Sequence, residues 1–275
     1  MQKAWGTIEP EYRLQPDLRY AGDPVTLLIN DDLVPALRDG RVRSAYGIRR
    51  IVGGRRVEME DGSVLEDIDA IVACTGYHTS FDLLGDAMTF KHTTATGRDA
   101  LKVPPQPDLY QNVFSLSYPD SLACLNYIAI PENTAGCSEL ASMAIAQVWS
   151  GKTSLPPPAE MRREVSFHQS WFESRCLNES TTQPPGMVRG GPWLEFVHRT
   201  AGTGLYENLS CWTWRGLMFS LTRPWMYVAM AYGVNTPHMW RFFETGKRRA
   251  WEGAEEAILH ANRMSKIDLE DKAEA

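Results

Sequence analysis

Apolar and charged residues alternate after residue 54, and this alternation predicts β structure. In RRVEME (55–60) the apolar residues Val57 and Met59 are separated by charged ones, and Asp61-Gly62 is typical of a tight hairpin turn before SVLED (63–67) returns. The next stretch, IDAIVAC (68–74), is apolar on both faces, which is typical of a strand in the middle of a sheet. The pattern predicts a hairpin that leads into a buried central strand.

The residues before this hairpin predict a short helix and more β structure. Asn30 can cap a helix that Gly40 ends, and the residues between them include the acidic pair Asp31 and Asp32, which suits the positive end of a helix. VRSAYGIRRIV (42–52) predicts one or two short strands, closed by a turn at Gly53-Gly54.

The second half of the chain is predicted to be mostly helical after two more strands. NVFSLS (112–117) and CLNYIAI (124–130) are typical of buried strands. Residues 132–152 suit a helix that ends at Gly151, with Ala141, Ala144, Ile145 and Val148 on one face, and a further helix is expected within 155–176, after the prolines.

The apolar stretch at 216–234 raises the question of a membrane span. Arg223-Pro224 lies in its middle, so a spanning helix would carry a costly central charge. Buried or half-buried helices are the favoured interpretation, and no transmembrane anchor is expected.

Composition narrows the class of protein. The 275 residues are 43% hydrophobic with a net charge of −6 and no long basic run, which favours a globular protein whose partner is not nucleic acid. The five cysteines show no paired spacing, which fits buried free thiols in a reducing compartment, and the first residues lack the apolar core of a signal peptide. A cytoplasmic protein is expected.

Four segments, in the same order along the chain, resemble the C-terminal half of flavin-containing monooxygenases of a fungal type. The resemblance spans about residues 23 to 263. The matching segments are DGSVLEDIDAIVACTGYHTSFDLL (61–84), LYQNVF with SLACLNYIAI (109–114 and 121–130), GCSELASMAIAQVWSGKTSLPPPAEM (136–161) and TPHMWRFFETGKRRAWEGAEEAI (236–258).

The resemblance implies an α/β fold, specifically a partial two-dinucleotide-binding-domain (FAD/NAD(P)-binding) fold with a helical C-terminal region. Residues 1–78 would be the tail of an NADPH-binding domain that ends in a Thr-Gly-Tyr linker. Residues 79–152 would be the returning part of an FAD-binding domain, and residues 153–275 the helical C-terminal region.

The first expected cofactor contact is the linker Thr75, Gly76 and Tyr77. By the resemblance it passes close to the flavin, because Gly76 has no side chain and Thr75 offers a hydroxyl. Read from the residues alone, the same segment is a tight strand-to-loop turn with a buried Tyr77. In this sequence Cys74 stands where the family has alanine.

The second expected contact is the start of the helix after residue 131. A helix N-terminus carries a positive dipole end, and by the resemblance this one points at the flavin ring. Asn133, Thr134, Gly136 and Ser138 are then the nearest residues. Ordinary helix capping by Thr134 or Ser138 explains the same residues equally well, and Ala141 replaces the family's glutamine.

Several sites of chemistry are not predicted. The six histidines are dispersed without metal-ligand spacing, so no metal site is expected and surface or packing roles are favoured. No G-x-S-x-G nucleophile turn occurs, and no catalytic residue is assigned. The sequence also contains no G-x-G-x-x-G, the turn that binds the pyrophosphates of FAD and NADPH.

The resemblance implies an FAD- and NADPH-dependent monooxygenase, similar to N,N-dimethylaniline monooxygenases. Such an enzyme inserts one oxygen atom of O₂ into a soft nitrogen or sulfur centre of a small nucleophilic substrate, through a flavin hydroperoxide. Without its two glycine turns this chain is expected to be an inactive fragment, with the missing N-terminal half as a partner. The alternatives are a non-catalytic interaction module and a Baeyer–Villiger-type monooxygenase fragment.

Overall fold

The computed structural model describes six segments of the chain, which divide into two compact units. The described segments are 9–13, 32–74, 80–97, 99–130, 134–178 and 183–271. Described residues up to Ser80 fall in the first unit and those from Phe81 onward in the second. Each unit is described by itself.

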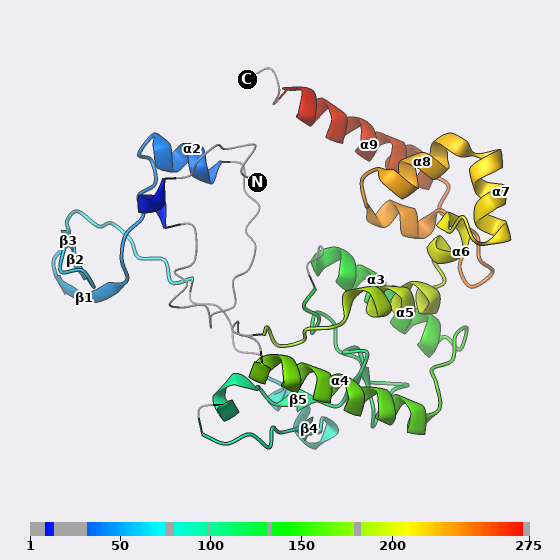
Figure 1. Cartoon of the computed structure of the whole chain (residues 1–275), viewed down its shortest axis with the longest axis horizontal. Helices are drawn as coiled ribbons and strands as arrows, with labels where there is room; N and C mark the ends of the chain where they lie inside the picture. Colours follow the sequence, from blue (N-terminus) through cyan, green and yellow to red (C-terminus); the bar gives the residue numbers. More distant parts are fainter. Residues whose placement is uncertain are drawn as a thin grey trace. The chain divides into compact units, whose positions relative to one another are not determined.

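The first unit contains a three-stranded antiparallel sheet, in the order β1 (Ile48–Gly53), β2 (Arg56–Met59) and β3 (Val64–Leu65) (Figure 1). The β1–β2 turn uses Gly53 and Gly54 at positive φ, and Ser63 donates its backbone N–H to Asp61 Oδ1 (3.0 Å) in the second turn. The predicted hairpin and both of its turns are therefore confirmed.

The predicted central strand at 68–74 is wrong. These residues form no strand, and Ile71 and Val72 are 47% and 81% exposed. A strand needs a neighbour to bond its backbone, and no described strand pairs with this segment. The apolar sequence is present, but the sheet that would bury it is not among the described residues.

The same unit holds two short helical elements. The 3₁₀ turn η1 spans Pro10–Tyr12, and α2 spans Leu33–Arg38 with Val34, Ala36 and Leu37 buried. The chain leaves α2 through Gly40 at a φ of +77°, as the sequence indicates. The predicted cap Asn30 lies outside the described residues.

The second unit is mainly helical, with small two-stranded sheets near its beginning (Figure 1). Its strands are β4 (Phe90–Lys91), β5 (Gln106–Pro107), β6 (Leu109–Tyr110) and β7 (Phe114–Ser115). Its helices are η3 (Asp82–Ala87), η4 (Asp99–Lys102), α3 (Thr134–Trp149), α4 (Pro158–Asn178), α5 (Gly190–Ala201), α6 (Leu205–Leu209), α7 (Trp214–Thr222), α8 (Pro224–Tyr232), η5 (Pro237–Arg241) and α9 (Ala254–Asp271).

The two strands predicted in this unit are only partly present. Of 112–117, only β7 is a strand, and it pairs with β6. Residues 124–130 form no strand and are joined to their neighbours by backbone hydrogen bonds and by a single bridge from Ala129 to Met187. Leu125 is 50% exposed, so this segment is also less buried than predicted.

Helix α3 is the centre of the main hydrophobic core and packs against α5. The predicted face is confirmed, because Ala141, Ala144, Ile145 and Val148 are all buried. Ala141 and Ala144 are small and allow the close approach of another helix, and buried apolar surface of this kind is the main stabilising term of a fold. The expected end at Gly151 is also observed, at a φ of +72°.

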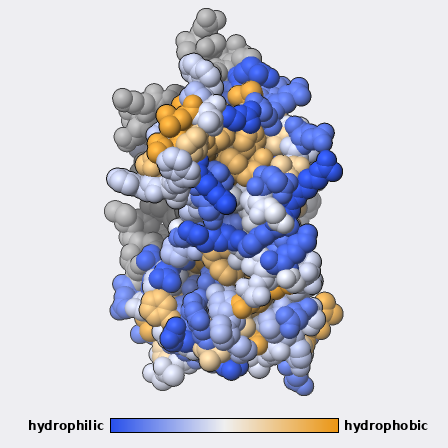
Figure 2. All heavy atoms as spheres, turned by 90° about the vertical axis from the view of Figure 1, so that its right-hand side faces the viewer, coloured by the Kyte–Doolittle hydropathy of each residue, from blue (hydrophilic) through white to orange (hydrophobic). Residues whose placement is uncertain are grey.

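The apolar stretch at 216–234 is divided between α7 and α8, which meet at Arg223. Phe219, Met226 and Met230 are buried, while Trp225, Leu221 and other apolar side chains are exposed. Figure 2 faces this side of the second unit and shows apolar side chains in its upper part. None of the described helices has the length and apolar character of a membrane span.

The five cysteines are free, as the sequence predicts, but they are not all buried. Cys137 and Cys176 are buried, whereas Cys74 and Cys211 are exposed. The mixture of helices and small sheets is compatible with an α/β FAD/NAD(P)-binding fold.

Candidate functional site

A cavity of about 430 Å³ lies beside the N-terminal end of α3. Its walls come from α3, α5, α6 and the start of η5, and most of them are apolar. The lining residues are Gly136, Cys137, Leu140, Leu194, His198, Leu205, Tyr206, Leu209, Ser210, Asn235, Pro237 and Trp240. This size and this mixture of apolar walls with a few polar groups are typical of a small-molecule site.

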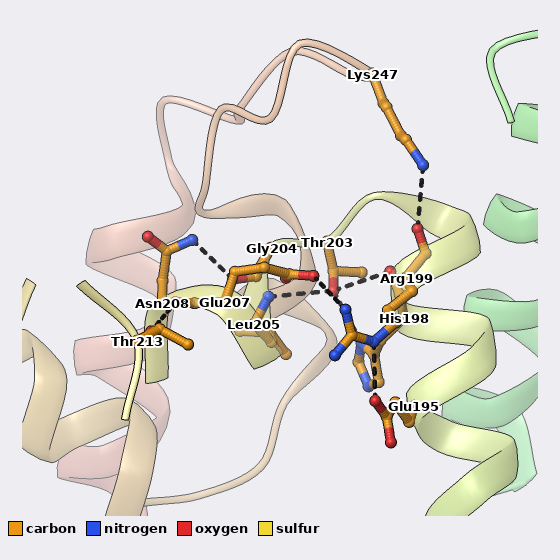
Figure 3. Close-up of polar contacts among 10 residues, drawn as sticks. All are labelled: Glu195, His198, Arg199, Thr203, Gly204, Leu205, Glu207, Asn208, Thr213 and Lys247. Atoms are coloured by element: carbon orange, nitrogen blue, oxygen red, sulfur yellow. Dashed lines mark hydrogen bonds and ion pairs between the residues drawn. The ribbon is translucent and has the colours of Figure 1, made fainter. Parts of the chain in front are cut away.

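The reversal between α5 and α6 positions the polar side of the cavity (Figure 3). Gly202 and Gly204 both adopt positive φ, so the chain turns back within three residues of the end of α5. Between them Thr203 is fully buried, and its N–H donates to the carbonyl oxygen of His198 (3.1 Å). The turn therefore holds the last part of α5 against the start of α6.

His198 is the one ionisable imidazole in the cavity wall, and burial keeps it neutral. Its Nδ1 lies 3.0 Å from the Thr203 hydroxyl, and its ring lies against the rings of Tyr206 and Trp240, with centroids 5.6 and 5.9 Å away. Burial lowers the pKa of His198 to about 4. Within the described part of the chain Nε2 has no hydrogen-bond partner, so it can donate to or accept from a molecule in the cavity.

A ring of polar contacts fixes the elements around His198 (Figure 3). Arg199 bonds Glu195 (2.9 Å) and Glu207 (3.4 Å), which joins α5 to α6, and Lys247 donates to the carbonyl oxygen of Arg199 (3.3 Å). Further along, Thr213 donates to the carbonyl oxygen of Glu207 (2.6 Å) and so connects α6 to the start of α7. These contacts connect α5, α6, the start of α7 and Lys247 around the segment that carries His198.

An ion pair joins the start of α3 to η5. Glu139 of α3 pairs with Arg241, the last residue of η5, directly after the cavity residue Trp240. The two side chains are partly exposed, so the pair contributes little free energy. It joins α3 and η5, two elements about a hundred residues apart that each contribute lining residues to the cavity.

Of the predicted cofactor contacts, Gly136 is the residue that the structure places in the cavity wall. Ser138 lies one turn from the start of α3, where its hydroxyl donates to Asn126 Oδ1 (3.2 Å). Thr134 is the first residue of α3 and is exposed. Ala141, the departure from the family's glutamine, is fully buried in the core.

The remaining predicted contacts lie outside the described residues. These are Thr75, Gly76 and Tyr77 of the linker and Asn133 before α3. Their approach to a cofactor stays a prediction. Among the residues that the structure does describe, no cluster of three metal-binding side chains occurs.

His198 and Trp240 are among the cavity residues that sequence reasoning missed. His198 is about sixty residues after Gly136 in the chain, and Trp240 is about a hundred after it. The sequence contained one signal, a histidine followed by the close pair Gly202 and Gly204, which marks a sharp turn beside it. That turn is what brings the imidazole to the cavity.

Comparison with known proteins relates nearly all of this chain to monooxygenases. A family model described as "Flavin-binding monooxygenase-like" matches residues 8–272. The chain is 34% identical over 264 residues to "Monooxygenase aurF" of Gibberella zeae, an alignment that covers 93% of this chain and 48% of that protein.

Mammalian relatives are more distant. "Flavin-containing monooxygenase 5" of Homo sapiens is 28% identical over 253 residues, with 90% of this chain and 41% of that protein covered. "Dimethylaniline monooxygenase [N-oxide-forming] 2" of Cavia porcellus is 25% identical over 250 residues, with the same two shares covered. The chain therefore spans less than half the length of each of these three relatives.

Proposed function

The chain belongs to the flavin-binding monooxygenase-like family, and on that premise we propose that it forms the C-terminal part of an FAD- and NADPH-dependent monooxygenase. The proposed reaction places one oxygen atom of O₂ on a soft nitrogen or sulfur centre of a small substrate. The observation that carries the proposal is the cavity at the N-terminal end of α3. It lies in a chain of which residues 8–272 match the family model.

The residues around this cavity fit the ring end of a flavin. When bound, FAD supplies the reduction of O₂ and the transfer of oxygen. The positive end of the α3 dipole would stabilise negative charge on a reduced ring, and Gly136 leaves room for close approach. Apolar walls such as Leu140 and Leu194 would exclude water from the reacting atoms.

His198 is proposed to orient the bound molecule. A neutral imidazole can hydrogen-bond a substrate or a ring atom without adding a charge to an apolar cavity. The hydrogen bond between Nδ1 and the Thr203 hydroxyl, together with the packing of Trp240, would keep its orientation fixed. Its proposed role is positioning, since no proton transfer to His198 is required.

The residues of this chain do not fit the pyrophosphate of FAD. The sequence has no G-x-G-x-x-G turn, and each charge-assisted hydrogen bond that such a turn supplies contributes about 1.5–3 kcal/mol. We therefore propose that the turns come from polypeptide corresponding to the N-terminal half of the relatives, and that this chain alone retains FAD poorly. From the family resemblance we further propose three regions, with bounds 1–78, 79–152 and 153–275.

Flavin content measured with and without a complementary half tests the proposal. The chain would be purified alone and after co-expression with the N-terminal half of the aurF relative, and bound flavin would be read from its visible absorbance. We expect no flavin with the chain alone, and flavin with NADPH oxidation in the reconstituted pair. A pair that assembles but stays colourless would overturn the monooxygenase proposal.

A glycine comparison tests the proposed linker contact. Gly76→Val in the reconstituted pair should lower the flavin bound per folded protein, because it adds bulk where the linker is proposed to pass the cofactor. Gly54→Val is the matched control, since Gly54 lies in the β1–β2 turn with open space around its Cα. Equal flavin content in the two variants would show that 75–77 is only a turn.

The second candidate function is a non-catalytic interaction module. The observation in its favour is the absence of both glycine turns from this sequence. If the chain is such a module, we expect a stable complex with a partner in which no flavin is bound and NADPH is not consumed.

If the reconstituted pair does bind flavin, a second experiment separates nitrogen or sulfur oxidation from Baeyer–Villiger chemistry. A sulfide, a tertiary amine and a ketone are supplied in turn, and the oxidised product of each is measured.

A further inference from the structure

A second cavity, of about 260 Å³, lies between α4, the β6–β7 turn and the start of α5. It shares no lining residue with the cavity beside α3. The residues that line it are Leu109, Tyr110, Gln111, Asn112, Arg163, Glu164, Val165, Phe167, His168, Val188, Arg189, Pro192 and Trp193. Neither the proposed oxygenation nor the family match gives this cavity a role.

The inner part of this cavity is apolar, aromatic and firmly held. Tyr110, Val165, Val188 and Trp193 are each at most 7% exposed. The indole Nε1 of Trp193 donates to the carbonyl oxygen of Gln111 (2.9 Å), which fixes the orientation of the ring. A planar apolar group would therefore meet a preformed surface that needs no rearrangement.

The mouth of the cavity carries two arginines. Arg163 comes from α4, and Arg189 directly precedes α5, where its guanidinium lies 5.0 Å above the ring of Phe167. Among the described residues neither arginine forms an ion pair, so both can bind an anion. Glu164 also lines the cavity, and its carboxylate accepts a hydrogen bond from Gln111 Nε2 (3.3 Å).

The positive charge of Arg189 reaches the interior of the cavity. Burial, with a further contribution from Arg189, lowers the pKa of the lining residue His168 to about 4. His168 is therefore neutral near pH 7 and does not compete with the arginines for an anion, although it can hydrogen-bond one. Arg163 and Arg189 outnumber Glu164, the one carboxylate among the residues that line this cavity, so the net charge of the lining favours a ligand with one negative end.

We infer that this cavity binds a small aromatic carboxylate, with its ring between Tyr110 and Trp193 and its carboxylate at Arg163 and Arg189. The planar guanidinium matches a carboxylate and can bond it through two N–H groups. A volume of about 260 Å³ is small for a ligand site, which limits the ligand to a single ring. This inference does not depend on the binding of flavin.

Ligand-detected NMR with benzoate as the probe tests this inference on the chain as it stands, with benzyl alcohol as the uncharged comparison. We expect saturation transfer to benzoate and much less to benzyl alcohol. Arg189→Gln and Arg163→Gln should each weaken benzoate binding about tenfold, as expected for the loss of a charged hydrogen bond. Arg162→Gln is the matched control, because Arg162 is the exposed neighbour of Arg163 on α4 and does not line the cavity.

Three results would overturn the inference. The first is no saturation transfer to benzoate from chain that is folded by circular dichroism. The second is equal weakening by Arg162→Gln and Arg163→Gln, which would mean that benzoate responds to overall charge and not to this cavity. Equal binding of benzyl alcohol and benzoate would likewise remove the role of the arginines.

Discussion

His198 is held uncharged because folding removes it from water without giving it an anionic partner. Burial is the cause of its low pKa of about 4, while an exposed histidine in the unfolded chain keeps an ordinary value near 6.5. Between these two pH values the unfolded chain binds a proton that the folded chain refuses. Lowering the pH from about 6.5 towards 4 therefore destabilises the folded chain through this residue.

We predict that His198→Phe flattens the dependence of stability on pH. The free energy of unfolding of the original chain should fall as the pH drops from about 7 to about 5, and His198 should account for about 2 kcal/mol of that fall. Phenylalanine keeps the ring packing against Tyr206 and Trp240 but does not titrate. Urea unfolding of both proteins at the two pH values measures the difference, and parallel pH profiles would contradict the assignment.

Gly186 has to be glycine because the backbone of Tyr127 leaves no space for a side chain there. It has a φ of +81°, and a Cβ there would lie 2.9 Å from the carbonyl carbon and oxygen of Tyr127. Its own carbonyl oxygen accepts hydrogen bonds from the Ala129 N–H (2.9 Å) and from Asn112 Nδ2 (3.0 Å). It thereby anchors the segment before α5 to the segment before α3.

We predict that Gly186→Ala destabilises the chain more than Gly246→Ala does. Both glycines have positive φ, so both substitutions cost about 1 kcal/mol of backbone strain, but Gly246 has open space where Gly186 has the Tyr127 backbone. An additional cost of about 1–3 kcal/mol is expected at Gly186. Equal urea midpoints for the two variants would show that the Tyr127 segment moves aside freely.

At the scale of elements, α7 begins at a well-formed cap. Thr213 is its N-cap residue, and the Thr213 hydroxyl oxygen accepts a hydrogen bond from the Gly216 N–H (3.0 Å). The same hydroxyl donates to the carbonyl oxygen of Glu207 in α6 (2.6 Å). One side chain therefore starts a helix and joins it to the previous one.

We predict that Thr213→Ala lowers the free energy of unfolding by about 1–2 kcal/mol, which is the usual cost of removing a capping hydroxyl. Thr213→Ser keeps the hydroxyl and should recover most of the loss. Thermal unfolding followed by circular dichroism compares the two variants. A serine variant as unstable as the alanine variant would mean that the methyl group of Thr213 matters and the cap does not.

The elements that could be predicted are those whose signals are local. The face of α3 and its end at Gly151 follow from residues within a few turns of each other, and the Asp61-Gly62 turn carries its own hydrogen bond. The strand predicted at 68–74 failed because a strand is completed by a distant neighbour that its own sequence does not specify. The lining of the cavity could be predicted only in part. Gly136 was predicted because it lies at the start of a helix that the sequence indicates, whereas the position of His198 depends on how α5 packs against other elements.

At the scale of the whole molecule, apolar surface is exposed in both units. In the first unit Ile51, Ile71 and Val72 are exposed, and in the second unit α7 exposes Leu221 and α8 exposes Trp225. No aspartate or glutamate occurs between Glu207 and Glu244, so the surface of α7 and α8 carries no acidic charge. Apolar groups that gather on a surface mark places where another molecule binds.

We predict that the folded chain binds a hydrophobic dye strongly, because so many apolar side chains are accessible. The double substitution Leu221→Gln with Trp225→Gln should lower the dye fluorescence and change the free energy of unfolding by no more than about 0.5 kcal/mol, since both residues are exposed. Phe219→Gln, at a buried position of the same α7, should instead unfold the chain. A cooperatively unfolding chain that ignores the dye would contradict this view of its surface.

The order in which the core closes has a consequence for synthesis on the ribosome. The core around α3 also contains Trp193 of α5, Trp240 of η5 and Ile258 of α9, and Ile258 is fully buried. A nascent chain that already displays α3 has to wait for more than a hundred further residues before Ile258 arrives. During that interval Leu140 and its neighbours lack their packing partners and remain open to chaperones or to other nascent chains. Emergence of α9, and not emergence of the first helices, is then the step at which this core becomes complete.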